Sequence, residues 1–409
     1  MADIDPAQLG ARAQAMIKAL AAVSAEPSRL VRLFLSPEHR RAADLVAQWM
    51  REAGLAVSED ALGTVRGRAG EGPRLLIGSH IDSVIDGGNY DGPLGVILGI
   101  IAAAHFGGRP PVPLDVLAFG DEEGSRFPAT LTASAACAGA FDPAVLVMTD
   151  RQGVSLADAI AAYGKNPAGI TKAAYRRDEV LAFVEAHIEQ GPVLEMEGEP
   201  LGVVTGIVGQ SRLRVTVTGE AGHAGTVPMA MRRDALAGAA SMVVMVERVA
   251  KADPRRSLVA TVGRIEASPG ATNVIPATVT FTIDLRDMDD TVRQRAIGTI
   301  RHEARNIAET RNLLVMLEPF HEENAIVCDA ALQDRLAEAI GALGHRALRM
   351  PSGAGHDAQM MARLCPSAML FVRCRRGISH NPAEFCKEGD MGAAAAALIG
   401  LIERFAASQ

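Results

Sequence analysis

Aromatic residues and runs of basic residues are scarce in this 409-residue chain. Aromatics make up 4% of the sequence, the formal net charge is −7, and no basic run is longer than pairs such as Arg232-Arg233 and Arg375-Arg376. A nucleic-acid surface needs an excess of Lys and Arg along the phosphate backbone. We therefore expect neither a nucleic-acid partner nor another polyanionic one.

Paired cysteines and long apolar segments are also lacking. The five cysteines are widely spaced and never form a CxxC motif, so neither a disulfide framework nor a thiolate zinc site is predicted. The opening MADIDPAQLG has acidic residues and no apolar stretch typical of a secretion signal. The longest apolar runs, Leu94–Ala104 and Met391–Ile402, are shorter than the ~20 residues that cross a bilayer. These features predict a cytoplasmic protein with buried helices and no membrane contact.

The apolar residues that are present, with hydrophobic types at 48%, predict an α/β fold in the first half of the chain. Residues 10–205 alternate helical stretches with short apolar strands, which is typical of a mostly parallel sheet with helices on both faces. Arg74–Gly78 and Leu114–Phe119 are expected strands, and Pro93–Ala104 is the helix between them. The chain also exceeds the roughly 250–300 residues at which one core stops growing, so we expect two domains.

Residues 211–318 show a different pattern and are predicted to form an inserted α+β domain. SRLRVTVTG and TVTFTIDLR alternate apolar and polar residues strictly, as half-exposed antiparallel strands do. With helices near 232–251 and 289–311, the order becomes β-α-β-β-α-β, a split βαβ arrangement. The catalytic domain is then discontinuous, covering 1–210 and 319–409, and the insertion is expected to serve dimerisation and closure over substrate.

Four clusters of His, Asp and Glu follow the predicted strands. They are His80-x-Asp82 with Asp91, Asp121-Glu122-Glu123, His187 in HIEQGP and His380 in SHNPAEF. In sheets of this kind, ligands bind beyond the carboxyl ends of the strands. Each cluster also has a plainer interpretation, as a solvated turn, an exposed helix or a helix end. Together they offer the nitrogen and oxygen ligands of a two-metal hydrolase.

The ordered motifs GSHIDSV, GGNYDGPLGV, DEEGSRF, HIEQGP, GHAGTVPM, ATNVIP, DLR and SGAGHDA carry a resemblance. From about residue 30 to 405 the chain resembles the dinuclear-metal M20 amidohydrolases, in the branch of N-carbamoyl-L-amino acid hydrolases and allantoate amidohydrolases. Thr64 and Val227 depart from the usual Asn and Thr of that pattern.

The resemblance implies a set of metal ligands and a general base. Asp91 would bridge two ions, and the other ligands would be His80, Glu123, His187 and His380. Glu122 would act as general base on the bridging water, and Asp82 would orient the His80 imidazole. Nitrogen and oxygen ligands suit Zn²⁺, Mn²⁺, Co²⁺ or Ni²⁺, and we take zinc as the default.

Further residues would bind substrate. The resemblance implies that His223 stabilises the tetrahedral oxyanion, reaching the partner subunit's site in a homodimer formed through residues 211–318. Asn273 and Arg286 would hold a substrate carboxylate, for which the planar guanidinium gives bidentate binding. Weaker candidates for substrate contact are Gln190, Arg212, Gly355 and His356.

The predicted activity is hydrolysis of the ureido C–N bond of a carboxylate-bearing small molecule. Allantoate or an N-carbamoyl-L-amino acid would be the substrate, with a slight preference for allantoate, and the products would be ammonia, carbon dioxide and an amine. Two alternatives stay open: an M20 peptidase or aminoacylase that acts on acyl amides, and a binding protein without catalysis. His187 and Gln190 disfavour the first, and retention of Glu122 beside five ligand positions disfavours the second.

Overall fold

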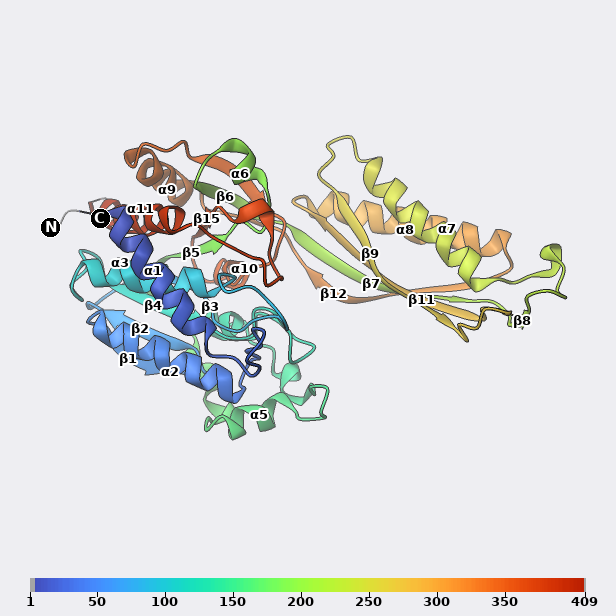
Figure 1. Cartoon of the computed structure of the whole chain (residues 1–409), viewed down its shortest axis with the longest axis horizontal. Helices are drawn as coiled ribbons and strands as arrows, with labels where there is room; N and C mark the ends of the chain where they lie inside the picture. The colour runs from blue at the N-terminus through green and yellow to red at the C-terminus, as the bar shows by residue number, and fades with distance from the viewer. Residues whose placement is uncertain (1–3, 408–409) are drawn as a thin grey trace. The chain divides into compact units, whose positions relative to one another are not determined.

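A nine-stranded sheet forms the centre of the larger part of the molecule (Figure 1). In the computed structural model, which describes residues 4–407, its order is β1-β2-β4-β3-β5-β15-β6-β13, and β14 pairs with β6. The four central strands β4, β3, β5 and β15 run parallel, while β2 and β6 join them in antiparallel fashion. The strands are β1 Ala56–Glu59, β2 Val65–Ala69, β3 Arg74–His80, β4 Leu114–Phe119, β5 Val180–Ile188, β6 Leu201–Ile207, β13 Ile326–Val327, β14 Leu348–Ser352 and β15 Ser367–Val372.

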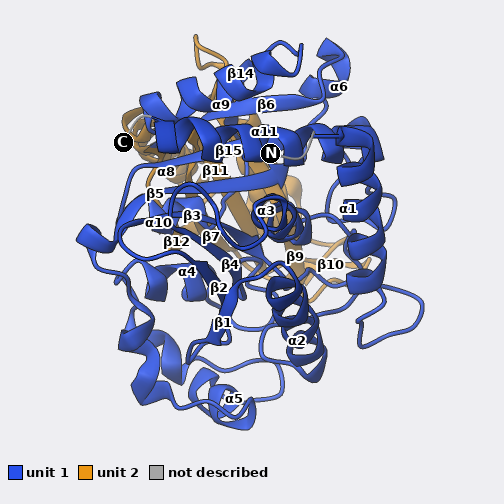
Figure 2. Cartoon of the chain, turned by 90° about the vertical axis from the view of Figure 1, so that its left-hand side faces the viewer, with its two compact units in different colours: residues 1–205, 327–409 blue, residues 206–326 orange. Residues whose placement is uncertain are grey.

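Helices cover both faces of this sheet, with α1, α2 and α3 on one side and α4 and α10 on the other (Figure 2). Helix α3 is nearly all buried, and so is the segment Met391–Ile402 of α11, as the apolar runs predicted. The helices of this part are α1 Pro6–Ala21, α2 Pro37–Glu52, α3 Pro93–His105, α4 Thr132–Cys137, α5 Leu156–Ala162, α6 Val193–Glu197, α9 Ala330–Ala342, α10 Ala358–Met361 and α11 Glu388–Ala407. The predicted α/β class is confirmed.

The central strands place polar residues at their carboxyl ends. Every residue of β3, β4 and β15 is buried, which explains why their residues are mostly apolar on both faces instead of alternating. One detail of the prediction is wrong: we expected His80 two residues beyond its strand, whereas His80 is the last residue of β3. Its backbone is still paired with Phe119 of β4, so the histidine is held by sheet hydrogen bonding instead of by a loop.

The second part is a four-stranded antiparallel sheet with the order β12-β7-β11-β9. The chain order is β7 Gly209–Thr218, α7 Ala235–Lys251, β9 Val259–Ser268, β11 Thr278–Asp287, α8 Asp290–Thr310 and β12 Leu314–Glu323. A small ladder joins β8 Gly222–His223 to β10 Val274–Ile275. Alternate residues of β7 and β11 are buried, and they pack against α7 and α8 in one core. The strict alternation therefore reflects one covered sheet face.

Two compact units account for the chain: residues 1–205 with 327–409, and residues 206–326. The predicted insertion was 211–318. The extra residues in the observed unit include the ends of β7 and β12, whose antiparallel pairing continues from Leu314 as far as Glu323. Among residues 4–407, no helix combines the length and apolarity that a membrane span requires.

Candidate metal centre

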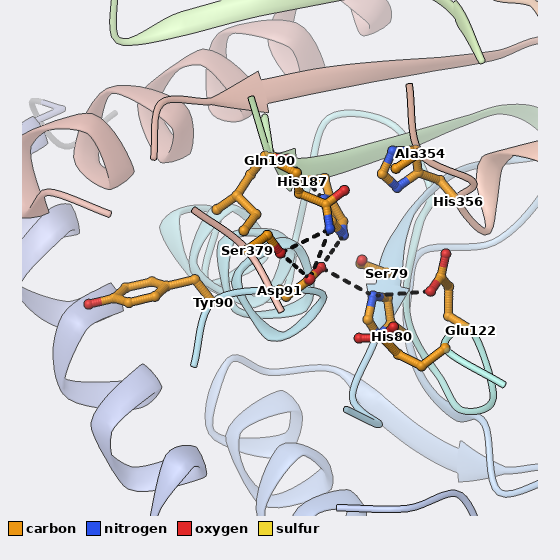
Figure 3. Close-up of polar contacts among 12 residues, drawn as sticks. Ser79, His80, Tyr90, Asp91, Glu122, His187, Gln190, Ala354, His356 and Ser379 are labelled. Carbon is orange, nitrogen blue, oxygen red and sulfur yellow. Dashed lines mark hydrogen bonds and ion pairs between the residues drawn. The ribbon is translucent and has the colours of Figure 1, made fainter. Parts of the chain in front are cut away.

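The buried carboxylate of Asp91 lies at the centre of the polar cluster in the larger unit (Figure 3). Its Oδ1 atom is 3.1 Å from His187 Nε2 and 3.9 Å from His80 Nε2, and its Oδ2 atom is 3.2 Å from His380 Nε2. The structure thus brings together residues from the ends of β3 and β5 and from the segment between β15 and α11.

Local backbone features let these side chains meet. Gly92 has a φ of +82°, and a Cβ atom there would lie 2.3 Å from Cε1 of His80. Only glycine therefore lets the chain pass beside the imidazole. Pro93 then begins α3, where its fixed φ suits the first helical turn. Asp91 is consequently held two residues before a buried helix.

Two overlapping donor sets share Asp91. The first is His80, Asp91 and His187; the second is Asp91, Glu123 and His380, with His380 Nε2 3.4 Å from Glu123 Oε2. All five predicted ligands therefore lie in one cluster, and one carboxylate belongs to both sets. A third set, Glu185, His187 and His356, was not predicted and also has the spacing of a metal site.

Glu122 and Asp82 flank the first set. Glu122 Oε2 is 3.9 Å from His80 Nε2, and Glu122 belongs to neither donor set that contains Asp91. Asp82 Oδ1 is 3.4 Å from His80 Nδ1, and the Asp82 carboxylate also accepts hydrogen bonds from the backbone N–H groups of Glu122 and Glu123. Asp82 thus connects the two loops that carry these residues.

Burial and crowding of like charges dominate the electrostatics. Burial, and then the neighbouring Asp91, raises the pKa of Glu123 to about 7. Burial also raises the pKa of Glu122 well above its usual range, with contributions from Glu123 and Asp357. Burial opposes ionisation of Asp91 too, but the neighbouring imidazoles of His187 and His380 hold its pKa well below the usual value. So many buried carboxylates are costly unless positive charge is close.

The residues present fit divalent metal ions. The Nε2 atoms of His80 and His187 are buried and have no hydrogen-bond partner, which is unusual for imidazole. Both nitrogens face the carboxylate of Asp91. The donors are nitrogen and oxygen only, as first-row divalent ions accept.

Other predicted residues of the larger unit take different places. Gln190 donates to Asp91 Oδ2 at 2.8 Å, so in this structure it contacts a predicted ligand. His356 is buried with its ring centroid 4.5 Å from that of His187, and Ser352 Oγ lies 2.8 Å from its Nε2. Gly355 lies in the segment between β14 and α10 and is only partly buried.

Sequence reasoning missed several buried or partly buried polar residues around the cluster. Ser379 and Glu384 contact Asp91, and Glu185 accepts hydrogen bonds from Ser79 Oγ at 2.8 Å and from the N–H of Ala358 at 2.9 Å. Their signal was weak: Ser379 and Glu384 flank His380 in SHNPAEF, and Glu185 precedes His187 by two residues on β5.

The remaining predicted residues lie in the second unit as two groups. In the first, β8 pairs with β10, so His223 lies opposite Val274 and the N–H of Ala224 donates to the carbonyl of Asn273 at 3.0 Å. In the second, Arg212 and Arg286 both bind the carboxylate of Asp284, at 3.1 and 2.8 Å. Gln210, which was not predicted, accepts from Arg212 at 3.3 Å. Asp284 therefore holds the two guanidinium groups next to each other.

Comparisons with known proteins match nearly the whole chain. The model of Peptidase family M20/M25/M40 matches residues 76–404. The chain is 42% identical to an allantoate deiminase from Arabidopsis thaliana, covering 98% of this chain and 83% of that protein. It is 40% identical to an N-carbamoyl-L-amino acid amidohydrolase from Geobacillus stearothermophilus, covering 97% and 98%.

Solved structures are also similar to the chain over nearly its whole length. The crystal structure of AtUAH in complex with glyoxylate superposes with a TM-score of 0.86 at 32% identity, covering 98% of this chain and all of that one. An amidase of the hydantoinase/carbamoylase family from Burkholderia multivorans also gives a TM-score of 0.86, at 34% identity and with 96% and 97% covered.

Proposed function

The chain belongs to Peptidase family M20/M25/M40, and from that premise we propose that it hydrolyses the ureido C–N bond of a carboxylate-bearing small molecule. The proposal depends above all on Asp91, which is shared by two donor sets beside a carboxylate, Glu122, that belongs to neither of them. Allantoate is the first candidate substrate and N-carbamoyl-L-amino acids are the second. Both are candidates because relatives that carry these names are about equally similar to the chain.

Two divalent ions would be held by the sets His80, Asp91, His187 and Asp91, Glu123, His380, with zinc as the default and manganese, cobalt or nickel as alternatives. Such ions polarise a carbonyl group and lower the pKa of water when they are bound. The unpartnered Nε2 atoms of His80 and His187 support this assignment. Asp82 would keep the His80 ring in place through its Nδ1 side.

Glu122 would move the proton. As general base it would take a proton from the attacking water and then deliver it to the leaving nitrogen. Its side chain is 13% exposed, and its surroundings raise its pKa, which suits a carboxylate that must hold a proton briefly. The bond that breaks joins the carbamoyl carbon to nitrogen, and the released carbamoyl fragment yields ammonia and carbon dioxide.

The second unit would supply binding groups. Arg286 would bind the substrate carboxylate, with Asn273 and Arg212 as helpers; Asp284 orients both arginine side chains. His223 would donate a hydrogen bond to the oxyanion. Its Nδ1 accepts from the N–H of Gly225 at 3.0 Å, so in the neutral ring the hydrogen is on Nε2, ready to be donated.

We further infer a homodimer formed through the second unit. Strand β9 is an edge strand with Val259 57% exposed and Ile265 48% exposed, and Val244 on α7 is 66% exposed. Apolar side chains on an open edge support pairing with another copy. Sedimentation of the purified protein tests this, and a monomer at micromolar concentration would contradict it.

Ammonia release from allantoate, N-carbamoyl-L-amino acids and ureidopropionate tests the activity, with acyl amides in parallel. Glu122→Gln should reduce turnover by at least about 10²-fold and leave metal content unchanged. Glu52→Gln, at an exposed position at the end of α2, is the matched control and should behave as the wild type. Release of a free carboxylic acid from acyl amides without ammonia from ureido acids would favour an aminoacylase instead.

A further inference from the structure

Glu384 forms a hydrogen-bonded frame behind Asp91. Its Oε1 atom accepts from the backbone N–H groups of Tyr90 at 2.8 Å and Asp91 at 3.1 Å, and its Oε2 atom lies 3.1 Å from Ser379 Oγ. Glu384 is only 4% exposed. We propose that Glu384 is a positioning residue that fixes the orientation of the Asp91 carboxylate for metal binding, an inference that rests on the proposed function.

The contacts of Asp91 show what this frame controls. Asp91 Oδ2 receives hydrogen bonds from Ser379 Oγ at 2.6 Å and Gln190 Nε2 at 2.8 Å, and Gln190 also donates to Ser379 at 3.2 Å. These donors hold the carboxylate with Oδ1 toward His187 and Oδ2 toward His380. A carboxylate shared by two donor sets must keep this orientation, since rotation about χ2 would take one oxygen away from its set.

Glu384 lies between the loop that precedes Asp91 and the segment that carries His380. A Cβ atom on Gly88 would lie 2.2 Å from Glu384 Cδ, so the loop before Asp91 passes directly over the Glu384 carboxyl group. The other segment is anchored by an antiparallel backbone β-bridge that pairs Cys374 with Cys386, whose thiols are both free. The N–H of Arg375 also donates to the carbonyl of Phe385 at 2.8 Å. Glu384 therefore connects a glycine loop with an anchored loop that carries His380.

Both carboxylate oxygens of Glu384 lie within hydrogen-bond distance of groups of the chain, and Glu384 belongs to none of the donor sets found among the described residues. Glu384 would therefore influence metal binding only by positioning Asp91 and Ser379. Outer residues that orient metal ligands change metal affinity by about 10- to 100-fold when they are replaced. This range sets the expected size of the effect.

Glu384→Ala, Glu384→Gln and a matched control test the inference. The control is Asp60→Ala: Asp60 accepts from the backbone N–H groups of Leu62 at 2.9 Å and Thr64 at 3.0 Å, in a loop that carries none of the predicted site residues. It removes the same kind of contact, so loss of loop stability alone should appear equally in both alanine variants. The measurements on full-length protein are zinc and manganese affinity by competition with a chelating dye, thermal midpoint, kcat and KM.

Glu384→Ala should weaken metal affinity about 10- to 100-fold, lower kcat at limiting metal, leave KM within about threefold and regain activity with excess metal. Glu384→Gln keeps an acceptor for the two N–H groups and should stay within about threefold of the wild type. Asp60→Ala should lower only the thermal midpoint. Wild-type metal affinity in Glu384→Ala, or an equal loss in Asp60→Ala, would overturn the inference. A wild type that releases no ammonia would contradict the proposed function instead, since metal affinity is measured without substrate.

Discussion

Acidification is expected to destabilise this protein through His39, far from any predicted ligand in sequence. His39 is fully buried, its Nδ1 lies 3.0 Å from Tyr163 Oη, and its Nε2 has no partner. Burial lowers the pKa of His39 to about 4. The negative charge of Asp82 opposes this shift, and three nearby arginines reinforce it: Arg32, Arg40 and Arg126. The native state therefore holds His39 in its neutral form.

The sign and size of the effect follow from the two pKa values. The pKa of His39 is about 4 in the native state and about 6.5 in the unfolded chain. The stability that comes from the neutral form is fully present above about pH 6.5 and is lost as the pH falls toward 4, because only the unfolded chain then binds the proton. Between pH 8 and pH 5 the loss is about 2 kcal/mol.

Urea unfolding of the wild type and His39→Asn at several pH values measures this loss. Asparagine keeps a polar group near Tyr163 but cannot take up the proton. The difference in unfolding free energy between the two proteins should change by about 2 kcal/mol from pH 8 to pH 5, while the titration of metal ligands, common to both, cancels. Parallel pH profiles for the two proteins would refute the reasoning.

Three further predictions concern the site and the core. Gly92→Ala should lose metal and activity, because its Cβ would lie 2.3 Å from His80 Cε1. The control is Gly72→Ala: Gly72 also has a positive φ but no atom within 4 Å of an added Cβ, so this variant should cost only about 1 kcal/mol of stability. Metal analysis and thermal melting distinguish the two outcomes. Asp115→Asn should cost about 3–5 kcal/mol in urea unfolding, because Asp115 is fully buried and binds three side chains, Arg68, Arg74 and Tyr175; a loss under 1 kcal/mol would contradict this. Arg286→Lys should raise KM about tenfold or more through loss of bidentate binding, while Arg176→Lys, at an exposed position of the larger unit, should leave KM unchanged. A wild-type KM in Arg286→Lys would show that Arg286 does not bind the substrate.

Much of the fold was predictable because its signals are local. Leu114–Phe119 was predicted as a strand with the observed limits, and Thr278–Arg286 differs from β11 by one residue. Strand and helix periodicity depends on neighbours along the chain, which the sequence displays directly. Strand ends are less certain: His80 remained in β3 because Phe119 continues the ladder, and no pattern around residue 80 indicates that pairing.

The site was predictable to the extent that its motifs contain the chemistry. The residues predicted as ligands lie together, but Gln190 contacts Asp91 and was predicted to contact substrate. His39 lies in none of the motifs, and nothing in the residues around it indicates that it is fully buried. Burial of a single polar residue depends on what packs over it from elsewhere in the chain, here Tyr163 and Gly120.

The amino-acid sequence by itself determined the types of element, the nitrogen and oxygen donors and the order in which they occur, because these depend on residue chemistry and short-range periodicity. The motifs also indicated Asp91 as the shared carboxylate, but only the tertiary structure decided that Glu384, 293 positions later, binds its backbone. Such contacts depend on which strands are neighbours and on where the loops cross, and these long-range distances are set by packing of the whole sheet and its helices.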